Sequence, residues 1–398
     1  MNPWRGLKNI PHNVWLLSYA TLINRSGTMV LPFLAIYMNK KIGVSVSAAG
    51  MVLMFYGLGA LLTAPFAGKL ADKIGELKVM RISLFATGFL LYFYSFVKDY
   101  NSIIIITMVW AVISEAFRPA NLSLISFESE PEQRKTSFSL NRLAINLGMS
   151  IGPVVGGFLS QIDYSLLFYV NGTTSILAGI FLSVIKLDSK KNIKSKVVDS
   201  NQVLPKPKFT IFNDKHYLLY LIVLIPVCLV FFQFIGGLPL YIVRELKYSE
   251  STFGFMMAIN TGLIILIEVP LNNAMEMWDD RKAIALASIL AAVGFGSMAL
   301  SSHFYVLIIS IIIWTFGEMM FFPSSASYTA KISPDTLRGE YMGYYQMMFS
   351  FSLMMGPWFG AVLLDKLGPT FLWGWAFVFG LISAFSFLLF SKRISKPN

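Results

Sequence analysis

The stretch Gly152-Pro153-Val154-Val155-Gly156 is matched 204 residues later by Gly356-Pro357-Trp358-Phe359-Gly360. The same interval separates three further pairs: Pro119 and Pro323, Arg134 and Arg338, and Gly50 and Gly254. Two more pairs are one position out of step: Glu115 with Glu318, and Pro65 with Pro270. The chain therefore contains two copies of one unit. Such a duplication in an apolar chain is typical of solute transporters, in which two similar helical bundles move around a site between them.

The composition indicates that lipid surrounds most of the chain. Hydrophobic residues make up 56% of the 398 residues and charged residues only 13%, about half of the charged share of a soluble protein. Runs of about 20 residues with few charges are long enough to cross a bilayer as helices. We find twelve such runs, six in each half, near residues 13–38, 47–68, 80–97, 102–126, 137–160, 165–186, 217–243, 251–275, 283–301, 304–330, 341–364 and 370–391.

These runs predict an all-α membrane protein. Backbone groups inside hydrocarbon must be hydrogen-bonded internally, and unbroken apolar runs meet this need as helices, whereas barrel strands alternate over about ten residues. The repeat then predicts two pseudo-symmetric bundles of six helices, over residues 1–187 and 216–398. Residues 188–215 are rich in Lys, Asn and Ser and contain two prolines, as is typical of a linker between two domains.

The distribution of basic residues predicts the orientation in the membrane. Most of the 32 Lys and Arg residues lie in the termini and in the even-numbered connections, so the positive-inside rule places both termini in the cytoplasm. The net charge of +11 is then explained by basic residues that face anionic lipid, and we expect no nucleic-acid partner. Cys228 is the single cysteine, so no disulfide forms within the chain. The N-terminus has no cleavable signal pattern, and we expect the first span to remain.

A charged loop, Gly68-Lys69-Leu70-Ala71-Asp72-Lys73-Ile74-Gly75, follows the second predicted span. A small residue at position 68 allows helices to approach closely, and a glycine at position 75 permits a tight turn. The loop resembles the signature loop of the major facilitator superfamily, although Glu76 and Leu77 stand where that family usually has basic residues. The resemblance implies a gating role for Gly68, Asp72, Lys73, Gly75 and Lys78. The alternative is an ordinary charged loop that obeys the topology rule.

Two further kinds of motif resemble the same superfamily. Residues 131–134 and 334–339 are similar to its loop motif after spans four and ten, which implies that Arg134 and Arg338 brace the cytoplasmic gate. Residues 148–157 are similar to the antiporter motif that lies in span five of the drug/proton antiporter families, and that resemblance favours export. The motif comprises Gly148, Gly152, Pro153, Gly156 and Gly157. On a helix, Gly148, Gly152 and Gly156 form one close-packing stripe. The alternative is that this stripe is only a packing surface, without any bearing on transport direction.

Six ionisable residues fall inside the predicted spans, where a charge costs at least about 2 kcal/mol and usually faces a cavity. They are Arg25, Glu115, Arg118, Arg142, Glu268 and Glu318. Burial of a carboxyl group in an apolar cavity favours its protonated form, so that a proton gradient can load and unload it. Glu115, Glu318 and Glu268 are therefore our candidates for proton coupling. Glu115 and Arg118 are three residues apart on one helical face, and a structural salt bridge between them is the alternative.

Polar residues inside the spans are candidates for lining a substrate cavity. These are Asn24, Arg25, Arg118, Arg142, Asn146 and Gln346. Arg142, Asn146 and Pro153 share a stripe about a quarter turn from the glycine stripe, so that one face of the helix packs while the other lines a cavity. An aromatic share of 15% and 20 Met residues suit a cavity that accommodates bulky apolar groups.

The resemblance implies alternating access of two six-helix bundles to a site between them. We expect proton-coupled efflux of amphipathic small molecules, driven by a proton gradient and without a cofactor or metal. The alternatives are a proton-coupled symporter of zwitterions such as short peptides and a receptor that kept the transporter fold. The sequence has no nucleotide-binding loop and no His/Cys metal cluster, so we expect no enzyme. Its expected partners are a small-molecule substrate and the bilayer, with a monomer in the inner (cytoplasmic) membrane of a bacterium.

Overall fold

The computed structural model describes residues 10–129, 134–185, 213–275, 277–300, 302–334 and 338–393. Within these ranges it does not describe the side chains at positions 64, 65, 68, 69, 72, 134–136, 139, 273, 338–340 and 390–393. Nearly all described residues are helical and none forms a strand. The predicted all-α class is therefore confirmed. The predicted linker lies mostly outside the described residues, and the domain boundaries stay a prediction.

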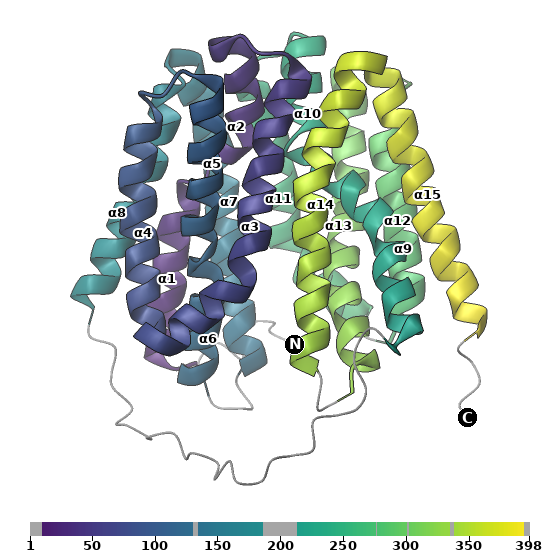
Figure 1. The fold of residues 1–398 in the computed structure, drawn as a ribbon. Coiled ribbons are helices and arrows are strands. Elements are labelled where there is room, and N and C mark those ends of the chain that lie inside the picture. The colour runs from purple at the N-terminus through teal and green to yellow at the C-terminus, as the bar shows by residue number, and fades with distance from the viewer. Residues whose placement is uncertain are drawn as a thin grey trace.

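The helices alternate in direction across one bundle (Figure 1). Those of the first half are α1 (His12–Ser26), α2 (Val30–Tyr37), η2 (Met38–Ile42), α3 (Val46–Ile74), α4 (Glu76–Tyr94), α5 (Tyr100–Glu115), α6 (Phe117–Glu128), α7 (Arg134–Ile162) and α8 (Ser165–Val184). Those of the second half are α9 (Lys215–Phe231), η4 (Phe232–Phe234), α10 (Gly237–Leu240), η5 (Tyr241–Glu245), α11 (Glu250–Ala274), α12 (Asp280–Ser297), α13 (Phe304–Ile332), α14 (Arg338–Leu367) and α15 (Pro369–Arg393).

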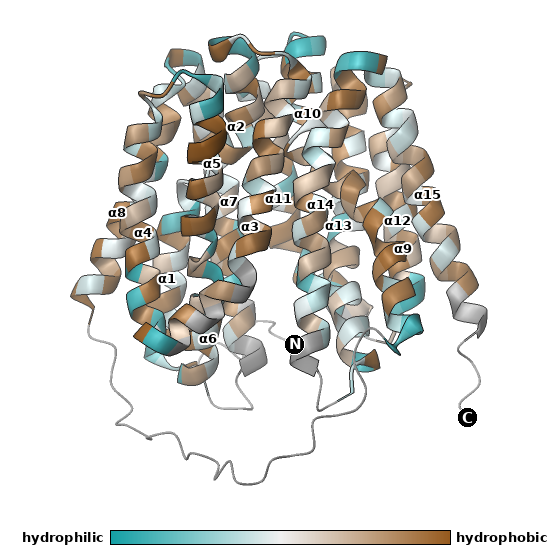
Figure 2. Ribbon diagram, viewed as in Figure 1, coloured by the Kyte–Doolittle hydropathy of each residue, from teal (hydrophilic) through white to brown (hydrophobic). Residues whose placement is uncertain are grey.

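The described helices account for the twelve predicted spans. Ten helical segments are long and apolar enough to cross a membrane by themselves, and α5 with α6 counts as one of them. The first predicted span is α1 and α2, which are separated by Gly27, Thr28 and Met29. The ninth is α12, with 18 residues. Hydrophobic residues follow the length of the helices and hydrophilic residues gather near both ends (Figure 2), as expected of helices that cross a bilayer.

The repeat is visible in the backbone. The first span of each half is broken and ends in a π-helical turn, η2 in the first half and η5 in the second. Each π-turn is followed by a residue with positive φ: Gly43 at +80° and, 204 positions later, Lys247 at +60°. A lysine in this left-handed region is strained, whereas a glycine is not.

We expect Lys247→Gly to raise the free energy of unfolding by about 1 kcal/mol, because it removes the steric cost of a side chain at positive φ. The repeat supplies the matched control, since Gly43→Ala should lower stability by a similar amount. Thermal unfolding of both purified variants in the same detergent measures the two changes. Equal melting temperatures for wild type and Lys247→Gly would contradict the assignment of strain.

The glycine stripe on α7 packs against the break between α1 and α2. A side chain on Gly148 would meet Arg25, one on Gly152 would meet the Thr28 carbonyl oxygen at 2.5 Å, and one on Gly156 would meet Met29. The second half repeats this contact, because Gly356 and Gly360 of α14 lie against η4 and its Gln233. The predicted close-packing face is thus confirmed, and its partner is the broken first helix of each half.

Gly152→Ala should lower the free energy of unfolding by about 1 to 3 kcal/mol, because the added methyl group overlaps backbone atoms that cannot move independently. Gly262→Ala in α11 is the control, since nothing lies within 4 Å of its added carbon. The control should be neutral or slightly more stable, as alanine favours helix over glycine. Melting temperatures of both variants test this difference, and equal losses would refute it.

The two halves meet mainly along two pairs of helices, α3 with α14 and α7 with α11, and α2 also contacts α10. The contacts are related by the repeat: Gly50 of α3 lies against Trp358 of α14, and Gly254 of α11 lies against Val154 of α7. We call the end where α8 ends and α9 begins the linker end, and the opposite end, which holds α2 and α10, the far end (Figure 1).

Candidate functional site

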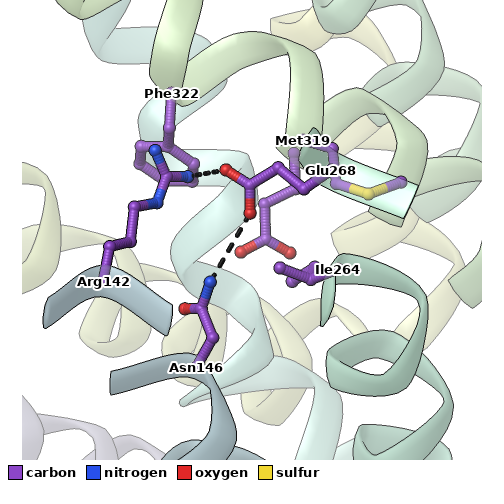
Figure 3. A pocket seen from close by; sticks show the side chains of 7 residues that line it. Arg142, Asn146, Ile264, Glu268, Met319 and Phe322 are labelled. Carbon is purple, nitrogen blue, oxygen red and sulfur yellow. Dashed lines mark hydrogen bonds and ion pairs between the residues drawn. The ribbon is translucent and has the colours of Figure 1, made fainter. Parts of the chain in front are cut away.

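A small pocket lies where the two halves meet, with Arg142 and Asn146 of the first half facing Glu268 of the second (Figure 3). It is lined by residues of α7, α11 and α13: Arg142, Asn146, Ile264, Glu268, Glu318, Met319 and Phe322. Four of the predicted candidates, Arg142, Asn146, Glu268 and Glu318, thus come together from three helices that are far apart in the sequence. The volume of the pocket is about 30 Å³, which is enough for one or two water molecules.

An ion pair between Arg142 of α7 and Glu268 of α11 crosses from one half to the other. The Asn146 amide nitrogen lies 3.5 Å from the second oxygen of the same carboxylate. The two partners differ in burial, since 47% of the Arg142 side chain is exposed but only 9% of the Glu268 side chain.

Glu318 is held by a neutral partner. The amide nitrogen of Asn260 on α11 donates to the Glu318 carboxylate at 2.9 Å and to the Thr315 hydroxyl at 2.9 Å. No cation of the described residues pairs with Glu318. Because Glu268 is already balanced by Arg142, the pocket carries one net negative charge when all three groups are ionised. A proton or a cationic ligand would neutralise that charge.

Glu115 lies apart from this pocket, within the first half. Its carboxylate accepts a hydrogen bond of 3.0 Å from the Tyr56 hydroxyl of α3. The alternative of a salt bridge between Glu115 and Arg118 is wrong for the described structure, in which Glu115 forms no ion pair. The reason is a break in the helix: α5 ends at Glu115 and α6 begins at Phe117, so the three-residue spacing does not place the two side chains on one continuous face.

The other predicted cavity residues do not line the pocket. Asn24 accepts a hydrogen bond from Ser175 at 3.2 Å, and the Arg25 Nε is buried without a hydrogen-bond partner. Arg118 is exposed and Gln346 is half-buried. Of the six predicted cavity residues, Arg142 and Asn146 line the pocket.

The predicted gating loop is described in part. Gly75 has a φ of +91°, which confirms the expected tight turn, and Lys73 and Lys78 are exposed. The side chains of Asp72, Arg134 and Arg338 and the surroundings of Gly68 lie outside the described residues, so their gating role stays a prediction. Residues 131–133 and 335–337 also lie outside them.

Glu76, the departure from the family pattern, has a structural partner. Its carboxylate accepts a hydrogen bond from Ser123 at 3.0 Å. The residues 204 positions later repeat the pair, with Ser327 donating to Asp280 at 3.2 Å. Lys331 adds an ion pair to Asp280 at 2.5 Å. An acidic residue at this position therefore ties the start of α4 or α12 to the following span.

Asp279 precedes α12 and lies outside the membrane-spanning part. Its carboxylate accepts hydrogen bonds from the Arg281 guanidinium at 2.8 Å and from the Arg281 backbone N–H at 2.9 Å. These bonds hold the pKa of Asp279 below its usual range. Asp279 therefore caps α12 as a charged group.

The far end is closed by a set of polar contacts that the sequence did not predict, which we call the far gate. Ser47 donates to Asp365 at 2.7 Å, and Gln161 donates to Ser251 at 2.6 Å. The two pairs are related by the repeat, since Ser251 lies 204 positions after Ser47 and Asp365 lies 204 positions after Gln161. Glu250 adds an ion pair with Lys40 at 2.7 Å and accepts a hydrogen bond from Tyr164 at 2.7 Å. The halves are therefore joined at the far end.

The sequence analysis missed the Asn260 amide, which donates to Glu318, and the apolar pocket residues Ile264, Met319 and Phe322. Asn260 is uncharged, so a search for ionisable residues in the spans passes over it. The sequence feature that could have identified it is an amide side chain inside the eighth predicted span, 204 positions after Tyr56. Phe322 belongs to a chain with 34 phenylalanines, and nothing in the sequence distinguishes it from those that face lipid.

Comparison with known families and relatives gives consistent matches over the whole chain. The profile described as Major Facilitator Superfamily matches residues 17–267 and 235–398. The chain is 25% identical to the uncharacterized MFS-type transporter YqjV of Bacillus subtilis, over 92% of this chain and 89% of YqjV. It is 21% identical to a Na(+), Li(+), K(+)/H(+) antiporter of Planococcus maritimus, over 93% and 94%. It is 24% identical to the quinolone resistance protein NorA of Staphylococcus aureus, over 85% of both chains.

Solved structures share the fold. A POT family transporter in complex with a thioalcohol conjugated peptide superposes with a TM-score of 0.78 at 15% sequence identity, over 98% of this chain and 100% of that chain. At this low sequence identity, the comparison supports a shared fold and nothing more.

Proposed function

Because the chain belongs to the Major Facilitator Superfamily, it is an integral membrane transporter and not an enzyme, and we propose that it exports amphipathic small molecules in exchange for protons. The proposed cargo carries a positive charge. The proton and the cargo bind in turn to Glu318, while alternating access of the two halves moves them in opposite directions.

One observation carries this proposal: Glu318 lies in a pocket between the halves without a described cationic partner. An ionised carboxylate at this depth is costly unless a proton or a cation compensates it. Competition of the two for one carboxylate makes their binding mutually exclusive, which is the requirement for exchange. The apolar side chains of Ile264, Met319 and Phe322 border the same pocket and suit the hydrophobic part of the cargo once the pocket opens.

The relatives support the same direction of transport. One relative's name describes an antiporter of alkali cations and protons, and another's name describes resistance to quinolones. The glycine motif of α7 resembles that of drug/proton antiporters. We place the protein in the inner (cytoplasmic) membrane of a bacterium as a monomer, with both termini in the cytoplasm, the proton gradient as its energy source and no cofactor.

A symporter of zwitterions is less well supported. That function needs Arg142 to bind the carboxylate of the solute, but Arg142 is already paired with Glu268 in the described structure. A receptor that does not transport is also less well supported. The contacts between the halves occur in two copies related by the repeat, and such an interface suits two halves that move against each other.

Proton flux in proteoliposomes tests the proposal. With an acidic lumen and a fluorescent pH dye inside, external tetraphenylphosphonium should release protons from vesicles that contain the protein, and protein-free vesicles should show no release. Dialanine should have no effect. Accumulation of tetraphenylphosphonium that is unchanged after nigericin collapses the pH gradient would refute proton exchange, and proton movement with dialanine alone would favour the symporter.

A further inference from the structure

Two carboxylates occupy equivalent places in the two halves. Glu115 ends α5 and Glu318 lies in α13, 203 positions later. Each accepts one hydrogen bond from the neighbouring span: from the Tyr56 hydroxyl at 3.0 Å in the first half, and from the Asn260 amide at 2.9 Å in the second. The two donors are 204 positions apart. The pair of a donor and a carboxylate is therefore part of the duplicated unit.

The donors differ in chemistry. A tyrosine hydroxyl donates or accepts, so it suits a carboxyl group in either protonation state, whereas an amide N–H only donates and favours the ionised carboxylate. Asn260 is also fixed in place, because its amide nitrogen donates to Thr315, whose hydroxyl donates in turn to the Ile311 carbonyl oxygen at 2.6 Å. Asn260 is 7% exposed and Thr315 is fully buried.

The surroundings of the two carboxylates differ as well. Glu318 lines the pocket between the halves, where the other charged groups that face it are Glu268 on α11 and Arg142 on α7. Glu115 lies within the first half and outside that pocket. Its partner Tyr56 packs edge-on against Trp110, with ring centroids 4.9 Å apart. The first pair thus joins α3 to α5, and the second faces the moving interface.

We propose that Asn260 is a positioning residue that holds Glu318 in its ionised form toward the pocket and so sets the pH range of exchange. The Tyr56–Glu115 pair keeps a structural role in the first half. This inference rests on the proposed function, because it assigns the geometry of the carboxylate that exchanges protons for cargo.

The pH dependence of exchange tests the inference. Loss of the amide donor removes an interaction with the ionised carboxylate, so Glu318 holds its proton up to a higher pH. We therefore expect Asn260→Leu to move the half-maximal pH of tetraphenylphosphonium/proton exchange upward by about one unit. Asn260→Gln, which keeps a donor, should move it less. Thr315→Val leaves the amide without its anchor and should give a smaller shift in the same direction.

Tyr56→Phe is the matched control at the repeat-related position. It should lower the melting temperature without moving the pH profile. An unchanged profile in Asn260→Leu, or an equal shift in Tyr56→Phe, overturns the inference. If Asn260→Leu does not fold, Thr315→Val decides by the same criterion. Absence of proton-linked exchange in the wild type would instead overturn the proposed function, so the two failures are distinct.

Discussion

Glu318→Gln is expected to abolish proton-driven transport while the protein stays folded. Glutamine has nearly the same shape and still accepts a hydrogen bond from Asn260, which lies 2.9 Å from the present carboxylate, but it neither binds a proton nor carries a charge. Loss of a positioned proton acceptor reduces rates by about 100-fold or more. Uptake of tetraphenylphosphonium into proteoliposomes with an acidic lumen should fall to nearly the level of protein-free vesicles.

Glu115→Gln is the matched control for this prediction. Because Glu115 is bonded to Tyr56 outside the pocket, the control should retain proton-driven uptake. The melting temperature of each variant in detergent separates loss of function from loss of fold. Retained uptake in Glu318→Gln, or equal losses in both variants, would contradict the assignment of Glu318 as the proton site.

Arg142→Ala is expected to be the most destabilising change in the pocket. It leaves the carboxylate of Glu268, whose side chain is only 9% exposed, without its cation. Breaking a buried ion pair by removing one partner costs about 3 to 5 kcal/mol. We therefore expect a large drop in the melting temperature and loss of transport, since the pair also joins the two halves.

The opposite deletion should have a much smaller effect. Glu268→Gln leaves the guanidinium of Arg142, whose side chain is 47% exposed, and water can solvate it, so we expect a loss of about 1 kcal/mol or less. The double variant Arg142→Ala/Glu268→Gln should recover much of the stability lost in Arg142→Ala. A greater loss in Glu268→Gln than in Arg142→Ala would show that the buried carboxylate is not the costly partner.

Much of the fold was predictable because its signals are local or duplicated. Twelve apolar runs give twelve spans, and the spacing of the Gly-Pro pairs reveals the repeat. The break between α1 and α2 was not predictable from its own span, because Thr28 and Met29 lie against the glycine stripe of α7, more than a hundred residues away. A helix break of this kind depends on packing between distant segments rather than on local composition.

The charged residues of the candidate site were predictable, but their arrangement was not. Because burying a charge inside a span is costly, Arg142, Glu268 and Glu318 could each be identified as a candidate from the sequence. Their relative positions depend on how α7, α11 and α13 pack, which no spacing in the sequence encodes. Arg25 and Arg118 have the same signal and do not line the pocket. Position along a span does not tell which face of a helix meets the other half.

The far gate resembles the interface of a symmetric dimer whose two subunits are fused into one chain. Ser47 and Ser251 occupy equivalent positions, and so do their partners Asp365 and Gln161. In such an isologous surface each contact exists twice, and loss of one copy leaves the other in place. The two copies have nevertheless diverged, since a carboxylate faces one serine and an amide faces the other. Duplication thus leaves one copy of a contact free to acquire a charge while the second preserves closure.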